Sequence, residues 1–352
     1  MVEIVNSYQT DIDKASSSNL PWDKLSGKNI LITGSTGLIG SCIIDILMTR
    51  TNINYHVYAS GRNVKRLQEL EIKYKKSPYF HTLQYDVTTK LEANITFHYI
   101  IAAASGANPI LYSTDPVGVM RANLHGTDNL LSYGIKHGLE KYVFISSGDV
   151  YGENDGQVLT EDYSGYVNSL DIRSCYTLSK RATETLCISY ANQYSVDVSI
   201  ARPCHVYGPH FTETDTRVYT QFLRNVLRKE NIIMKSKGEQ YRSWCYVVDA
   251  ATGILYVLLK GKNCEAYNIA DENSNITIKE LAEMIADFEN LKVQFELPSD
   301  IEEKGYNRMK KSIFDSSKLK KLGWEIEGSM KQKMLNTLLE LKKEYNEKGG
   351  IR

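Results

Sequence analysis

Two residues with complementary proton chemistry, Tyr176 and Lys180, stand four positions apart. Side chains at this spacing share one face of a helix, and the segment 176–194 is predicted to be helical. A phenol is a poor base because its pKa lies near 10, but a neighbouring ammonium group favours the phenolate and lowers that pKa. The pair could therefore exchange a proton with a substrate hydroxyl while a hydride leaves the same carbon.

A glycine-rich segment near the start of the chain, Ile-Leu-Ile-Thr-Gly-Ser-Thr-Gly-Leu-Ile-Gly at 30–40, indicates a phosphate site. A phosphate approaches a backbone closely only where no Cβ stands in the way, and a helix that begins there points free N–H groups at the anion. An apolar strand precedes the glycines and an amphipathic stretch follows them, which is the setting of a dinucleotide-binding loop. The residues expected to hold the cofactor here are Gly34, Thr36, Gly37, Leu38, Ile39 and Gly40.

A third set of polar residues stands at the end of the buried strand expected at 141–147, in the order Ser146-Ser147-Gly148-Asp149. Polar residues at the carboxyl end of a central parallel strand lie at the crevice where open α/β sheets bind their ligands. The hydroxyl of Ser147 can share the proton of a substrate oxygen with Tyr176. We therefore expect Ser147, Asp149, Tyr176 and Lys180 to form the catalytic group.

The elements that must position these residues alternate between strand and helix, which predicts parallel β-α-β units with helices on both faces. The expected fold is α/β, a Rossmann doubly wound parallel sheet followed by a smaller mixed α/β C-terminal substrate domain. Beyond Pro203 short strands, including 266–269, mix with helices such as 250–259. The expected strands of the first part are 30–33, 55–59, 82–87, 96–102, 141–147 and 196–202, and its helices are 41–50, 64–74, 117–137 and 176–194.

The chain divides into four expected parts. They are an N-terminal extension (1–27) that drapes on the surface, a dinucleotide-binding domain with the catalytic helix (28–203), a mainly substrate-binding domain (204–345) and a tail (346–352). Leu20-Pro21-Trp22 is expected to anchor the extension, and the lysine-rich segment 331–348 is expected to be the solvated face of a helix.

Composition excludes several classes of function. The 352 residues contain 42 Lys and Arg and 42 Asp and Glu, so the formal net charge is zero, which argues against a general nucleic-acid binder. There is no apolar run of membrane-spanning length and no signal peptide, so we expect a cytoplasmic protein with no membrane partner. Six scattered cysteines are expected to be free thiols, and seven histidines without ligand spacing predict no metal site.

Taken together, the motifs resemble the extended short-chain dehydrogenase/reductase family of nucleotide-sugar epimerases, dehydratases and decarboxylases. Beside the glycine loop, Ser147 and the Tyr-x-x-x-Lys pair, the resemblance includes Asn123 in Asn-x-x-Gly-Thr, Arg202-Pro203-x-x-x-Tyr-Gly-Pro, and Arg242 followed by Tyr-Val-Val-Asp. It covers roughly residues 28–345.

The resemblance implies roles for individual residues. Ser147 and Tyr176 would handle the proton, Lys180 would bind the nicotinamide ribose, and Arg242 would bind the pyrophosphate of a nucleotide-diphosphate sugar. It also implies a homodimer formed through the helices at 117–137 and 176–194. Further cofactor contacts are expected at Asp86, Val87, Ala102, Ala103 and Pro203, and further substrate contacts at Ser105, Asp149, Arg173 and His205.

The reaction that follows the shared oxidation at sugar C4 depends on Asp149. The 4,6-dehydratases resemble Thr-Asp-Glu-Val-Tyr-Gly here, whereas this chain has Gly148 in place of the first acid. UDP-glucuronate decarboxylases look like Thr-Ser-Glu-Val-Tyr-Gly, so they are the most similar subgroup. Asp149 is one methylene shorter than that Glu, and His205 stands where Asn is usual. A 4-epimerase or 4-ketosugar reductase remains the alternative, a 4,6-dehydratase is a weaker one, and a non-catalytic dinucleotide-binding protein is a remote one.

The cofactor is expected to be bound and self-regenerating, but the sequence leaves NAD and NADP open. An NAD site usually has Asp or Glu at the end of the second strand. Here that strand ends Ala-Ser60-Gly-Arg62-Asn63, and Ser60 with Arg62 could hold a 2′-phosphate. Many relatives with a self-recycling cofactor use tightly held NAD, which favours the other choice.

Overall fold

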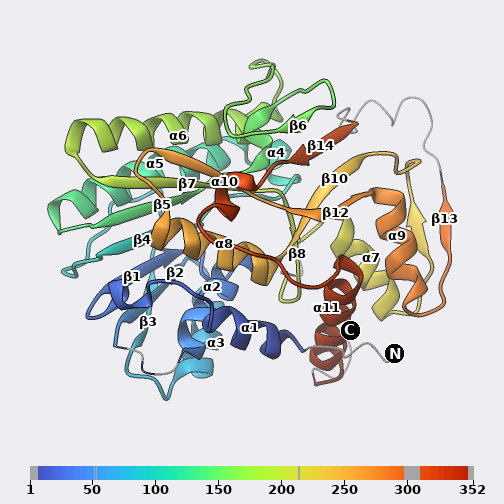
Figure 1. The fold of residues 1–352 in the computed structure, drawn as a ribbon, viewed down its shortest axis with the longest axis horizontal. Coiled ribbons are helices and arrows are strands. Elements are labelled where there is room, and N and C mark those ends of the chain that lie inside the picture. The colour runs from blue at the N-terminus through green and yellow to red at the C-terminus, as the bar shows by residue number, and fades with distance from the viewer. Residues whose placement is uncertain (1–6, 51, 53, 213–214, 297–309, 348–352) are drawn as a thin grey trace.

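A seven-stranded parallel sheet forms the centre of the protein, in a computed structural model that describes residues 7–50, 52, 54–212, 215–296 and 310–347 (Figure 1). The strand order β11-β7-β5-β4-β1-β2-β3 is that of a doubly wound sheet, which confirms the predicted fold class. The strands are β1 (Asn29–Thr33), β2 (His56–Gly61), β3 (Phe80–Gln84), β4 (Tyr99–Ala102), β5 (Lys141–Ile145), β7 (Asp197–Pro203) and β11 (Glu265–Ile269).

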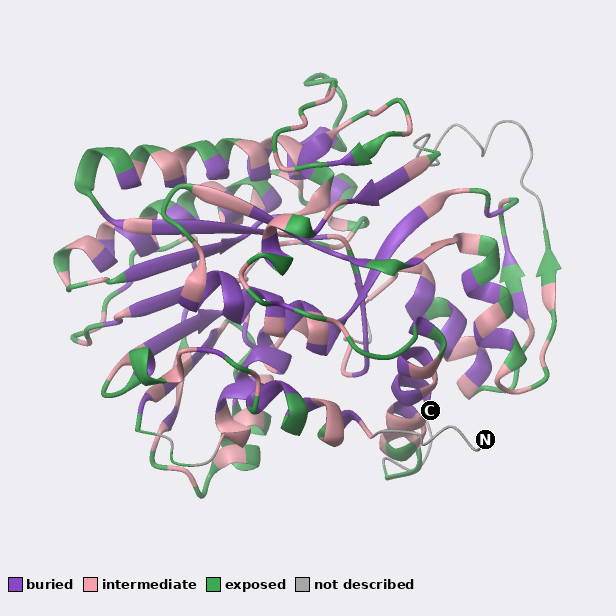
Figure 2. Ribbon diagram, in the orientation of Figure 1, coloured by how far each residue is buried: buried purple, intermediate pink, exposed green. Residues whose placement is uncertain are grey.

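Helices cover both faces of this sheet, because alternate residues of each strand point to opposite sides. In β1, Ile30 and Ile32 pack into the core beneath α2 (Leu38–Thr49) and α8 (Val247–Lys260), whereas Leu31 packs into the core beneath α5 (Pro116–Lys136) and α6 (Ser174–Tyr194). Both faces of the central strands are therefore buried (Figure 2). The helix α3 (Val64–Tyr74) lies on the α2 side and has the predicted bounds.

Two elements beyond residue 203 belong to the large sheet and not to the smaller domain where they were expected. The strand β11 pairs with β7, with Ala266 opposite Ile200, and α8 packs across β5 and β7. The segment 266–269 is a strand, as expected, but it belongs to the large sheet and not to the smaller domain. The local pattern of a short strand does not encode its pairing partner, so this placement could not be predicted.

The smaller mixed sheet is built around β10 (Tyr241–Tyr246), which pairs with β12, β14 and β8. The helix α9 begins with a capping box, in which the side chains of Thr277 and Glu280 each accept a hydrogen bond from the other's backbone N–H. The other elements are β6 (Val158–Leu159), β8 (His205–Tyr207), β9 (Ile232–Met234), β12 (Asp271–Thr277), β13 (Val293–Phe295), β14 (Lys311–Phe314), α4 (Leu111–Thr114), α7 (Val218–Leu227), α9 (Ile278–Asp287), α10 (Ser317–Lys320) and α11 (Met330–Glu347), with 3-10 turns at Trp22–Leu25 and Gly148–Tyr151.

The described part of the N-terminal extension, residues 7–27, packs on the core and does not merely drape on the surface. Its helix α1 (Tyr8–Ser16) packs on α2, α8 and α11, and Tyr8 and Ile12 are buried. Tyr8 donates to the buried carboxylate of Asp45 at 2.9 Å. The helix α1 therefore contacts both α2, which follows the glycine-rich segment, and the C-terminal helix α11 (Figure 1).

The lysine-rich helix α11 also differs from its expected solvated form, because one face of it is buried. Met334 and Leu338 lie in the core, and Lys333 pairs with Asp249 at 2.6 Å. Within the described part of the chain, no helix combines the length and the apolarity that a membrane span requires.

Candidate active site

The glycine loop between β1 and α2 has a backbone that requires glycine. Gly34 has φ +64°, and a Cβ placed there would lie 2.7 Å from the carbonyl oxygen of Ala103. A Cβ at Gly40 would overlap the carbonyl oxygen of Gly34. Gly37 is the N-cap of α2 and makes no side-chain cap, so the first N–H groups of this helix are left for a ligand.

Three buried hydroxyl groups line the same edge of the sheet. Among the residues that the structure describes, the Oγ atoms of Ser35, Ser60 and Ser146 are buried without a hydrogen-bond partner. They follow β1, end β2 and follow β5, so all three lie at the carboxyl edge of the sheet. Buried polar atoms are normally satisfied, and a dinucleotide with its ribose hydroxyls and phosphates has the polar groups that fit this edge.

The remaining expected cofactor residues lie along this edge too. Ala102 ends β4, Pro203 ends β7, and Ala103 approaches the glycine loop. Arg62 and Asn63 form the connection from β2 to α3, where Asn63 is the N-cap. The edge thus brings together residues from strands that are far apart in sequence.

Asp86 and Val87 lie beyond the end of β3, which is shorter than the strand expected at 82–87. The carboxylate of Asp86 accepts hydrogen bonds from the backbone and the hydroxyl of Thr88, at 2.9 and 2.8 Å. Burial alone would raise the pKa of Asp86, but these bonds and the charge of Arg62 hold the pKa below its ordinary value. Asp86 is therefore an anion at neutral pH.

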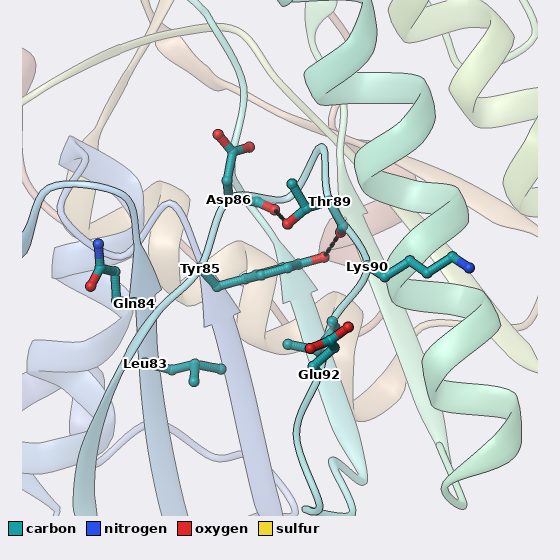
Figure 3. A pocket seen from close by; sticks show the side chains of 8 residues that line it. Leu83, Gln84, Tyr85, Asp86, Thr89, Lys90 and Glu92 are labelled. Atoms are coloured by element: carbon teal, nitrogen blue, oxygen red, sulfur yellow. Dashed lines mark hydrogen bonds between the residues drawn. The ribbon is translucent and has the colours of Figure 1, made fainter.

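A cavity of about 410 Å³ adjoins Asp86 and is lined by residues 83–86 and 89–92 (Figure 3). A second cavity, of about 660 Å³, is lined by residues that include Glu184 and Arg202. Neither is lined by Tyr176 or Lys180, so cavity size does not mark the catalytic group.

The residues expected to be catalytic meet near the first turn of α6. Tyr176 is buried, its ring is stacked on Tyr112 with centroids 4.9 Å apart, and the hydroxyl of Ser147 is near enough to lower its pKa. Lys180 lies one turn further, with its Nζ 5.7 Å from the centre of the Tyr176 ring and 2.7 Å from the carbonyl oxygen of Ile145. Ser147 caps the short turn that carries Asp149.

The electrostatics of this pair differ from the expectation. Burial, followed by the charge of Asp149, raises the pKa of Tyr176 above its ordinary value, although the nearby hydroxyl of Ser147 lowers it. Burial also lowers the pKa of Lys180 to about 7, against the opposing effect of Glu184. The expected lowering of the tyrosine pKa is therefore wrong for the protein as it stands without a cofactor, because desolvation disfavours both charged forms.

Asp149 lies in an arginine-rich part of the site. Solvent reaches its carboxylate, but protein surrounds it closely enough that desolvation raises its pKa, while the charges of Arg173 and Arg242 lower it. Arg242 is itself buried, on β10. A single carboxylate beside two guanidinium groups makes a locally cationic surface that fits an anionic ligand.

His205 lies on β8 next to this surface. Its ring is 5.3 Å from that of Trp244, and desolvation with the charges of Arg242 and Arg217 lowers its pKa to about 4. The imidazole is therefore neutral at neutral pH and can either donate or accept a hydrogen bond.

Two residues near the catalytic group were not expected from the sequence. The charge of Arg217 acts on both Tyr176 and His205, and Asp215 holds its guanidinium through two Nε contacts of 3.0 Å. The other is Tyr112, the stacking partner of Tyr176. The only sequence signal for Arg217 was the polar run Asp-Thr-Arg before α7.

Arg202 and Ser105 make their hydrogen bonds with other residues of the protein. Arg202 forms a buried pair with Glu184, at 2.7 and 3.0 Å, and donates to the Tyr151 hydroxyl. The hydroxyl of Ser105, an expected substrate contact, donates to Asn123 at 3.0 Å. Asn123 in turn donates to Ser179, so it joins α5 to α6 behind the catalytic face.

Comparison with known proteins gives a consistent result. Residues 30–270 match the pattern of the NAD dependent epimerase/dehydratase family. UDP-glucuronic acid decarboxylase 6 of Arabidopsis thaliana is 33% identical over 301 residues, which cover 85% of this chain and 84% of that protein. UDP-glucuronic acid decarboxylase 3 of the same plant is also 33% identical, over 84% of each chain.

Solved structures show the same fold. The UDP-glucose 4-epimerase of Thermotoga maritima superposes with a TM-score of 0.77 at 25% identity, over 90% of this chain and 99% of that one. The UDP-glucuronic acid 4-epimerase of Bacillus cereus, solved with UDP-glucuronic acid and NAD, gives 0.76 at 22% identity over 90% and 100%.

Proposed function

The chain belongs to the NAD dependent epimerase/dehydratase family, and from this premise we propose that it is a decarboxylase of a UDP-hexuronic acid such as UDP-glucuronate. The observation that carries the proposal is that the charges of Arg173 and Arg242 act on Asp149, whose own charge acts on Tyr176. A substrate carboxylate needs guanidinium partners, and the 33% identity to UDP-glucuronic acid decarboxylases supports the same choice.

The residues would divide the work as follows. Tyr176 accepts the proton of the C4 hydroxyl, and the nearby Ser147 hydroxyl shares that proton. The nicotinamide cofactor, held by the glycine loop and the hydroxyl-lined edge, supplies the hydride acceptor for C4. The positive charges of Lys180 and Arg217 are the groups that favour the tyrosinate.

The second half of the reaction follows from the ketone at C4. The C6 carboxylate is then that of a β-keto acid, so the C5–C6 bond breaks, its electron pair moves toward the C4 oxygen, and CO₂ leaves. A proton from solvent would then be taken up at C5, and return of the hydride to C4 with a proton from Tyr176 to the C4 oxygen would give the UDP-pentose. The Tyr176 and Ser147 hydroxyl groups stabilise the charge that develops on this oxygen. Arg173 and Arg242 orient the carboxylate, and Asp149 orients the arginines.

The proposal is tested by incubating the purified protein with UDP-glucuronate and measuring CO₂ and UDP-pentose. We expect turnover, and we expect Asp149→Asn to reduce it more than Asp149→Glu, because the second variant keeps the charge. Formation of UDP-galacturonate without CO₂ would instead identify a 4-epimerase. Consumption of one nicotinamide per product would identify a 4-ketosugar reductase. Either result overturns the decarboxylase.

We also propose a cytoplasmic homodimer. Val117 and Met120 on α5 are exposed apolar residues, and pairing of α5 and α6 with a second copy would cover them. The six cysteines are all free, which suits a reducing compartment. Light scattering of the purified protein and of Met120→Glu tests the dimer, and the variant should be monomeric.

A further inference from the structure

We propose that the adenosine end of the cofactor site is built for a 2′-phosphate, so that the resident cofactor is NADP and not NAD. This inference rests on the nicotinamide cofactor of the proposed function, but it concerns different residues from those that carry decarboxylation. It follows from the serine and arginine at and after the end of β2, and from the absence of a carboxylate at that strand end.

The end of β2 lacks the group that an NAD site uses. In such sites a carboxylate about 20 residues after the glycine loop bonds the ribose hydroxyls. Here Ser60 occupies the second-to-last position of β2, and Gly61 follows it. Ser60 is 0% exposed and its Oγ has no hydrogen-bond partner. A serine hydroxyl can donate to a phosphate oxygen without the repulsion that a carboxylate would bring.

Two arginines follow β2, Arg62 on the connection and Arg66 in the first turn of α3. The side chain of Arg62 is 78% exposed, and its nearest carboxylate oxygen, on Asp86, is 3.7 Å away, which is longer than a hydrogen bond. Arg66 donates from Nη1 to the carbonyl oxygen of Thr36 at 3.0 Å, so it lies against the glycine loop. A guanidinium beside the ribose is the group that accommodates a 2′-phosphate.

The N-terminal end of α3 adds partial positive charge near the two arginines. Asn63 caps this helix of 11 residues and accepts from the N–H of Arg66 at 3.1 Å. The N-terminal end of a helix favours a nearby anion. The region between the end of β2 and the start of α3 is therefore rich in hydrogen-bond donors and positive charge, which come from Ser60, Arg62, Arg66 and the helix end.

Asp86 is a charge that opposes a phosphate here. Its carboxylate is already bonded to Thr88, and Figure 3 shows it pointing away from the ring of Tyr85. Asp86 can hold Arg62 near the edge of the sheet, but a phosphate offers Arg62 a bidentate bond that the 3.7 Å contact does not.

The test compares 2′,5′-ADP with 5′-ADP, which differ in the 2′-phosphate, by calorimetry on the purified protein stripped of nucleotide. We expect 2′,5′-ADP to bind at least tenfold more tightly. Arg62→Ala should reduce this ratio about tenfold, Arg62→Lys should retain part of it, and Ser60→Asp should reverse it. Lys76→Ala is the matched control: it removes an exposed cation past the other end of α3, about 16 Å from the helix start, and should leave the ratio unchanged.

A second measurement needs no ligand addition. Chromatography of the nucleotide released from denatured, freshly purified protein should give NADP. Release of NAD, equal binding of the two nucleotides, or an unchanged ratio in Arg62→Ala would each overturn the inference. Decarboxylation of UDP-glucuronate by protein that carries NAD would overturn it while leaving the proposed function intact, whereas NADP in a protein that releases no CO₂ would do the opposite.

Discussion

Replacing Lys180 by methionine should stabilise the nucleotide-free protein while abolishing its activity. The Lys180 side chain is 2% exposed, and burial lowers its pKa to about 7. An unfolded chain has the ordinary lysine pKa of about 10.4, so between pH 7 and pH 10 the unfolded state binds more protons than the folded state. The stability of the wild-type protein should therefore rise with pH across this range.

The size of the effect follows from the two pKa values. One unit of difference corresponds to about 1.4 kcal/mol, so the buried amine opposes folding by about 4 kcal/mol at pH 7 and by about 2 kcal/mol at pH 9. Methionine removes this penalty but also loses the 2.7 Å bond to the Ile145 carbonyl, which is worth about 1 kcal/mol. The expected net gain is about 3 kcal/mol at pH 7 and about 1 kcal/mol at pH 9.

Urea unfolding of the wild type, Lys180→Met and Lys65→Met at pH 7, 8 and 9 measures this gain. Lys65 is exposed on α3, so its replacement controls for the general effect of removing a lysine. The decisive quantity is the change in the gain between pH 7 and pH 9, because the lost hydrogen bond cancels from it. A gain that does not vary with pH would refute the argument that desolvation of Lys180 sets its pKa.

Three other predictions concern single side chains. Tyr176→Phe should lower turnover at least a hundredfold and change the calorimetric affinity for UDP-glucuronate less than threefold. Glu184→Gln should lower the free energy of unfolding in urea by about 3 kcal/mol, because it leaves the buried Arg202 without its counter-charge; the double variant with Arg202→Met should recover part of this loss. Ile12→Ala, at a position 1% exposed, should cost about 3 kcal/mol in the same assay, and an unchanged midpoint would mean that α1 contributes nothing to folding.

The large sheet could be predicted because its strands are short continuous apolar runs between helices. The runs at 30–32 and 141–145 are buried on both faces, which is the pattern of a central parallel strand. The placement of β11 could not be predicted, because Glu265 and Ala266 are half-exposed and the strand is defined only by its pairing with β7. Likewise the polar-looking segment around Tyr8 gave no sign of the buried bond to Asp45.

In the candidate site, residues within local motifs were predictable and residues brought in by tertiary packing were not. Ser147 follows β5, and Tyr176 and Lys180 lie on α6, the next long helix of the chain, so their proximity follows from the β-α order of the sequence. Arg217 comes from the connection between β8 and α7, and only the fold brings its charge toward Tyr176. The direction of the Tyr176 pKa was mispredicted for a related reason: the spacing of Tyr176 and Lys180 is visible in the sequence, but their desolvation is not.

Desolvation also explains how the same pair can work as a proton acceptor. Burial disfavours an isolated tyrosinate and an isolated ammonium, so each pKa moves away from the charged form. When both charges are present together they attract one another in a medium where attraction is strong, and part of each desolvation penalty is recovered. The proton affinities of Tyr176 and Lys180 then belong to the pair and not to either residue. Nζ lies 5.7 Å from the centre of the phenol ring, so we expect a group that adds positive charge near Tyr176 to shift both titrations.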